Sequence, residues 1–209
     1  MEIFNKKTTV NTYIKKHICD SMFRDSNQFL WRVHYLIRTN EFSDKNWYSK
    51  IHVDLLMAIE SDLKAMIVAL SKNNESPEDA YKKARSYGHN ISNLYQEVEI
   101  RAKNRLKLIP QKKKELIIDK YTRLKVSNRY ELVTFYDIRT DTQNLNFTDS
   151  SLKNILSYNS LIEFEKLAIE LHDVSKNAIS KKPMIALNGR KLTLYFRRLN
   201  EFKNNIGRL

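Results

Sequence analysis

One short stretch of the chain brings together residue types that could act on a phosphate. Arg85 and His89 have three residues between them, and Lys82 and Lys83 come just before. Because histidine titrates near neutrality, His89 could deprotonate a ribose 2′-hydroxyl or protonate the leaving oxygen. The Arg85 guanidinium would stabilise charge that develops on the phosphate. We therefore name Arg85 and His89 as candidate catalytic residues for metal-independent RNA cleavage.

Further residues could hold the RNA beside this pair. Tyr87 could stack on a base, and a helix that begins near His89 or Asn90 would offer unpaired N–H groups to an anion. The candidate phosphate- and RNA-binding residues are Lys82, Lys83, Tyr87, Asn90, Arg101, Arg105, Lys112, Lys113 and Lys114.

The same residues also have structural interpretations. Gly88 would let the chain turn between two helices, and His89 would cap or pack at that turn. Arg85 would be a solvated charge on a short exposed helix. The run from Lys112 to Lys114 is either a solvated face or a face that contacts phosphate.

Basic residues are concentrated in the second half of the chain. The formal net charge is +13 over 209 residues. Residues 1–100 hold 14 basic and 13 acidic side chains, whereas residues 101–209 hold 23 and 11. Clustered positive charge attracts phosphate polymers and acidic surfaces. We therefore expect RNA or another polyanion as partner, with an acidic protein as a further option and a merely solvated basic surface as the alternative.

The composition favours a helical protein without a cofactor. Three glycines and three prolines are too few for the tight turns of a many-stranded β-fold. Cys19, the single cysteine, cannot form an internal disulfide, and five scattered histidines predict no metal site. The three glycines lie too far apart for a phosphate-binding loop. The apolar run from Ala65 to Leu70 is too short to span a bilayer. We expect a cytoplasmic protein with no cofactor and no membrane association.

Helical spacing of apolar residues predicts most of the elements in residues 1–128. Asp25 and Ser26 resemble an N-cap before a helix, and a strong helix is expected from about 53 to 70. Ser76 and Pro77 predict a helix start, with Gly88 as its stop. A helix from about 90 to 106 follows, and a basic helix is expected over 111–125.

The segment 129–209 is more mixed. Residues 130–138 are rich in β-branched and aromatic side chains and predict a strand. Apolar residues from Leu161 to Val174 predict a helix. Asn188 and Gly189 are typical of a hairpin turn, yet the residues from Leu192 to Phe202 also fit a helix, and both alternatives stay open. The expected division is a helical domain over 1–128 and a basic region over 129–209, which could pack on the same core.

Two stretches of the chain resemble HEPN domains. His52 to Leu70 resembles the long helix of that family, in which a glutamate precedes a Lys-Ala step, here Glu60 and Lys64. Tyr87 to Tyr95 resembles the Gly-His start of a later family helix, here Gly88 and His89. The resemblance covers roughly residues 25–110.

The resemblance implies a fold and two kinds of function. HEPN domains are mainly α up-and-down helical bundles, often homodimers, found in toxins, phage-defence effectors and nucleotide-handling proteins. The leading expectation is a toxin or phage-defence component that acts as a metal-independent endoribonuclease through Arg85 and His89. Family ribonucleases separate these two residues by a longer interval. The alternative is therefore a non-catalytic HEPN-like module that binds RNA, a nucleotide or an acidic partner protein.

Overall fold

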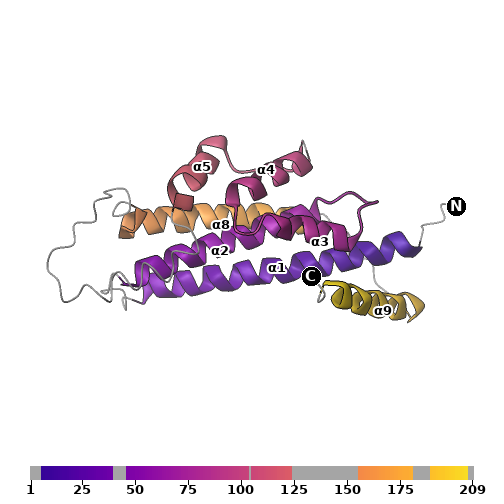
Figure 1. The fold of residues 1–209 in the computed structure, drawn as a ribbon. Coiled ribbons are helices and arrows are strands. Elements are labelled where there is room, and N and C mark those ends of the chain that lie inside the picture. Colours follow the sequence, from indigo (N-terminus) through magenta and orange to yellow (C-terminus); the bar gives the residue numbers. More distant parts are fainter. Residues whose placement is uncertain (1–5, 40–45, 104, 124–154, 181–188, 207–209) are drawn as a thin grey trace. The chain divides into compact units, whose positions relative to one another are not determined.

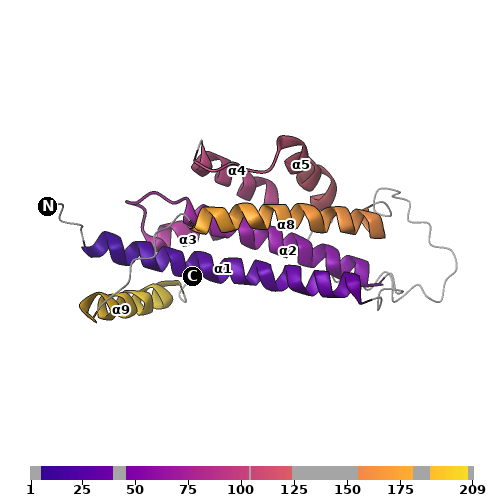
Figure 2. The same ribbon diagram turned by 180° about the vertical axis from the view of Figure 1, so that it is seen from behind.

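The protein is all-helical wherever its structure is described. The computed structural model describes residues 6–39, 46–103, 105–123, 155–180 and 189–206. These ranges contain seven α-helices, a π-helical turn, a 3-10 turn and no strand. Figures 1 and 2 show the helices from two opposite sides. The expectation of a mainly α protein with a helical bundle is confirmed at this level. The predicted strand at 130–138 and the predicted boundary at 128 lie outside the described residues.

The helices belong to two compact units, and each long helix contributes to both. The first unit draws on residues 1–24, 62–107 and 174–209, and the second on 25–61 and 108–173. The three long helices are α1 (Lys6–Arg38), α2 (Asn46–Ala69) and α8 (Tyr158–Ser180). The shorter ones are α3 (Pro77–Ser86), α4 (Ile91–Ala102), α5 (Gln111–Glu115) and α9 (Gly189–Ile206). The turns η2 (Leu116–Lys120) and η3 (Tyr121–Arg123) follow α5.

The first helix corrects one sequence prediction. Asp25 and Ser26 do not start a helix, because α1 runs without interruption through both. Ser26 is fully buried, and its hydroxyl lies 3.2 Å from Nδ1 of His172 on α8. The reason is the four-residue spacing that runs from Val10, Ile14 and Ile18 to Leu30 and places Ser26 on the buried stripe. Tertiary burial here outweighs local capping chemistry.

The last helix decides between the two alternatives left open at Asn188 and Gly189. Residues 189–206 form α9, so the second strand of the predicted hairpin does not exist, while 181–188 lie outside the described residues. Helical spacing lets α9 pack its aromatic side within the first unit. Tyr195 meets Tyr13 edge-on with 6.3 Å between ring centroids, and Phe202 meets Tyr81 at 5.6 Å. Arg198 Nη2 also donates to Glu78 Oε2 at 2.7 Å.

The predicted basic helix over 111–125 is confirmed as helical through Arg123, although only its first turn is regular α-helix; residues 124 and 125 lie outside the described residues. Regular α-helix ends at Glu115, and the chain continues through η2 and η3. Ile117 and Tyr121 are the fully buried residues of this segment, and the irregular turns carry Tyr121 into the core of the second unit. Its ring stacks on Phe164 with centroids 4.0 Å apart and planes 1° from parallel.

The core of the second unit also contains a histidine. His52 is 1 % exposed, and its ring centroid lies 5.1 Å from that of Phe164. His52 Nε2 lies 2.9 Å from the carbonyl oxygen of Tyr121. The Tyr121 hydroxyl donates to Glu163 Oε2 at 2.6 Å. Both units therefore have fully enclosed interiors, with Cys19 completely buried in the first. In the described ranges, no helix has the length and apolar character needed to cross a membrane.

Candidate nucleic-acid interface

Local hydrogen bonds and backbone conformation fix the corner between α3 and α4, where the two candidate catalytic residues, Arg85 and His89, lie. Ser76 caps α3, because its hydroxyl oxygen accepts the Asp79 N–H at 3.1 Å, and Pro77 occupies the first turn. Gly88 has a φ of +55°, a left-handed conformation that glycine adopts without strain. Asn90 then caps α4 by accepting the Asn93 N–H at 3.0 Å. The predicted start, the Gly88 stop and the existence of the following helix are confirmed, but α4 ends at Ala102, four residues before the predicted end at about 106.

The two candidate catalytic residues are exposed at this corner. Arg85 lies on the last turn of α3, and His89 precedes the cap of α4. Arg85 Nη1 donates to the Tyr81 hydroxyl at 2.8 Å, and the guanidinium carbon lies 5.6 Å from the Tyr81 ring centroid. Arg85 therefore lies back along its own helix. The Asn90 side chain caps α4 by accepting the Asn93 N–H, so this N–H group is already hydrogen-bonded within the helix and is not open to an anion.

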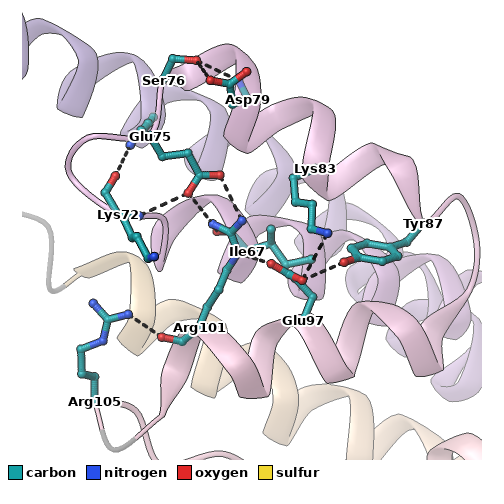
Figure 3. Close-up of polar contacts among 11 residues, drawn as sticks. Ile67, Lys72, Glu75, Ser76, Asp79, Lys83, Tyr87, Glu97, Arg101 and Arg105 are labelled. Carbon is teal, nitrogen blue, oxygen red and sulfur yellow. Dashed lines mark hydrogen bonds and ion pairs between the residues drawn. The ribbon is translucent and has the colours of Figure 1, made fainter.

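A buried carboxylate, Glu97, organises the other candidates (Figure 3). The Tyr87 hydroxyl donates to Glu97 Oε2 at 2.7 Å, and Lys83 Nζ lies 3.6 Å from the same oxygen. Arg101 Nε donates to Glu97 Oε1 at 2.6 Å. Burial alone would raise the pKa of Glu97, but the hydrogen bonds from Arg101 and Tyr87 outweigh it and hold that pKa below its usual value. Glu97 is therefore a structural anion and not a proton donor at neutral pH.

Arg101 ties three segments of the first unit together. Its Nη1 and Nη2 donate to the two carboxylate oxygens of Glu75 at 2.8 and 3.0 Å, a bidentate arrangement. Nη1 also donates to the Ile67 carbonyl at 3.3 Å. With its side chain 13 % exposed and its guanidinium shared between Glu75 and Glu97, Arg101 supports the α3–α4 corner. We name this set, Glu75, Lys83, Tyr87, Glu97 and Arg101, the Glu97 cluster.

Membership of the cluster changes the roles expected for Lys83 and Tyr87. The Lys83 Nζ lies 4.9 Å from the centroid of the Tyr87 ring, above one of its faces. That face is therefore covered by a cation, and the hydroxyl is directed at Glu97. Stacking of a base on this face of Tyr87 would require Lys83 to move.

Exposed cations of the first unit lie on α3 and in the segment that follows the end of α4. Lys82, Lys103 and Lys107 are exposed, and their side chains make no hydrogen bond or ion pair within the part of the chain that the structure describes. Arg105 is also exposed and donates through Nη2 to the Arg101 carbonyl. Lys103 and Lys107 were missing from the sequence-based site, although both fall in the basic stretch that begins at Arg101.

Four acidic side chains of α3, α4 and the loop before α3 accept hydrogen bonds within the fold. Glu75 and Glu97 bind Arg101, while Glu78 binds Arg198. Asp79 accepts the Ser76 hydroxyl at 2.6 Å. Three of these carboxylates are therefore paired with arginines, whereas Lys82, Lys103 and Lys107 are exposed.

The candidate lysines 112–114 belong to the second unit. Lys112 is exposed. Lys113 Nζ pairs with both carboxylate oxygens of Glu170 on α8 at 2.6 Å, and Lys114 is half-buried. The lysine run is thus neither uniformly solvated nor uniformly available to phosphate.

Comparison with protein-family models, with curated proteins and with solved structures finds no match to this chain. The resemblance to HEPN domains therefore depends on the sequence motifs alone.

Proposed function

We propose that the protein binds RNA through the exposed cations on α3 and in the segment that follows α4 in the first unit. The observation that carries this proposal is a difference in pairing between acidic and basic side chains. Glu75, Glu78 and Glu97 are paired with arginines within the fold. Lys82, Lys103 and Lys107 point to solvent without a carboxylate partner among the described residues. Such a surface attracts phosphate more strongly than the summed charge of the segment suggests.

The Glu97 cluster contributes stiffness to this surface. Glu75, Glu97 and Arg101 join the loop before α3 to α4 through hydrogen bonds of 2.6 to 3.0 Å. The exposed lysines flank elements fixed in this way, so less conformational freedom is lost when a ligand binds. Binding without catalysis is the function that these contacts favour.

Salt dependence tests the proposal quantitatively. Each phosphate contact to a single strand contributes roughly 0.7 to the slope of log affinity against log salt concentration. Replacing Lys82, Lys103 and Lys107 together by glutamine should therefore reduce the slope by about 2. The matched control replaces Lys166, Lys176 and Lys203, which are also exposed and unpaired in the described ranges. Both variants change the net charge equally, so equal slopes would refute the proposed surface.

A second candidate function is metal-independent RNA cleavage at His89. The exposure of His89 and Arg85 at one corner favours it. Total RNA incubated with the protein in EDTA distinguishes the two functions. Cleavage that disappears in His89→Ala supports the ribonuclease. Intact RNA with both proteins, together with a salt-sensitive mobility shift, supports a binding protein.

A further inference from the structure

A stacked pair of aromatic side chains is exposed on α1 in the second unit. Trp31 is 68 % exposed and Tyr35 is 49 % exposed. Their ring centroids lie 5.8 Å apart, and their planes are 17° from parallel. Large aromatic side chains are usually turned inward, where they bury 150–250 Å² each. This pair presents flat apolar surface to solvent instead.

The residues that share this helix face are polar and uncharged or basic. Positions three or four residues apart lie on one face of a helix, which places Asn27 and Gln28 one turn before Trp31 and Arg38 one turn after Tyr35. Asn27, Gln28 and Arg38 are exposed. We name these three residues together with Trp31 and Tyr35 the aromatic stripe.

The nearby carboxylates of the second unit are already engaged. Asp54 accepts both guanidinium hydrogen bonds of Arg32, and Glu165 Oε1 lies 3.1 Å from Nδ1 of His34. No acidic residue lies on the aromatic stripe itself, since Asp25 is the one acidic residue of 25–38 and falls on another side of the helix. Within the described ranges, no carboxylate therefore lies on this face of α1 to repel a negatively charged ligand.

We propose that Trp31 and Tyr35 form a stacking platform for unpaired bases of single-stranded RNA. Stacking of bases on aromatic rings tolerates any sequence, because every base has a flat face. The pair would take a base on its outer face, with Arg38 contacting a phosphate and the Asn27 and Gln28 amides bonding base edges. This inference rests on the proposed function, because RNA is the ligand in both. It adds a second site, which would bind unpaired bases and so distinguish single-stranded from double-stranded RNA.

The flanking chemistry favours a nucleic acid over a protein as the occupant. A protein-binding face of this kind would continue its apolar surface beyond the two rings. Here amides lie on one side of the rings and a guanidinium on the other, groups that match the base edges and phosphates of a strand.

Tryptophan fluorescence provides a direct test. A Trp47→Phe background leaves Trp31 as the single tryptophan. An oligouridylate should quench Trp31 emission, whereas an abasic oligomer of the same length and charge should not. Trp31→Ala should weaken oligouridylate binding between roughly fivefold and a hundredfold, the range for loss of one stacked base. Trp31→Phe should retain most of the affinity. Tyr158→Ala removes another exposed aromatic side chain of the second unit and should change nothing.

Several results would overturn the stacking platform. Equal quenching by the abasic oligomer, or unchanged affinity in Trp31→Ala with an unaltered melting temperature, would do so. A change of oligomeric state in Trp31→Ala without a change in affinity would instead assign the face to contacts between copies. Equal affinity for oligothymidylate would extend the site to DNA and refute selectivity for RNA.

Failure of this inference and failure of the proposed function give different results. If the lysine-to-glutamine triple variant shows the reduced salt slope while Trp31→Ala binds normally, RNA binding by the three lysines is supported and the stacking platform is refuted. If Trp31→Ala loses affinity while the lysine variant keeps the wild-type slope, base stacking is supported and RNA binding by the three lysines is refuted.

Discussion

Acidification should destabilise the protein through His52. This ring is enclosed in the second unit, and burial lowers its pKa from 6.5 to about 4, although the hydrogen bond to Tyr121 acts in the opposite direction. Because a carbonyl can only accept, Nε2 carries the ring proton of neutral His52. Nδ1 is buried and has no hydrogen-bond partner among the described residues. A second proton would therefore place an uncompensated charge inside the core.

The size of the effect follows from the two pKa values. Unfolded His52 binds a proton as the pH falls below 6.5, whereas folded His52 stays neutral until about pH 4. The stabilising contribution is thus complete above 6.5 and is lost as the pH falls toward 4. Between pH 7 and pH 5 the loss amounts to about 2 kcal/mol of unfolding free energy. Most carboxylates remain ionised in this interval.

Urea denaturation at pH 7, 6 and 5 measures this loss. His52→Gln is the control, because its amide can still donate to the Tyr121 carbonyl but cannot take up a proton. The stability difference between wild type and variant should shrink by about 2 kcal/mol on going from pH 7 to pH 5. A difference that stays constant across this interval would refute a neutral, enclosed His52.

Two further perturbations probe the α3–α4 corner. Gly88→Ala should lower the unfolding free energy by about 1 kcal/mol, because a φ of +55° is strained for alanine, although no atom lies within 4 Å of the added Cβ. Gly88→Asn should lower it by less. Equal stability of all three proteins in urea denaturation would contradict this prediction. Glu97→Gln and Arg101→Met should each destabilise by about 1 to 3 kcal/mol, and the double variant by less than their sum, because each single change removes one of the two counter-charges of its partner. Strict additivity in the double-mutant cycle would show that the two side chains are not coupled.

Elements defined by local chemistry could be predicted from the sequence. The start of α3 at Ser76 and Pro77, its stop at Gly88 and the Asn90 cap of α4 each depend on residues within one helical turn. The uninterrupted α1 could not be read in the same way. The Asp25–Ser26 pair has the chemistry of a cap, and only the burial of Ser26 against His172 removes that role.

The sequence predicted which residue types lie at the candidate site better than it predicted which of them contact one another. Arg85 and His89 are exposed at the expected corner. The Glu97 cluster was missed, because Arg101 and Glu75 are 26 positions apart and nothing local pairs them. The aromatic stripe, by contrast, left a signal. Trp31 and Tyr35 are four residues apart and fall off the apolar pattern that predicts the buried side of their helix.

The buried Cys19 provides a chemical probe of local opening and unfolding of the first unit. Its thiol is completely buried in the first unit and is the single thiol of the chain. A thiol-reactive dye can therefore label Cys19 only when the first unit opens locally or unfolds. The labelling rate then measures how often such opening occurs. Acid destabilisation through His52 originates in the other unit. If acid speeds the labelling of Cys19 as much as it lowers global stability, the two units unfold as one cooperative body.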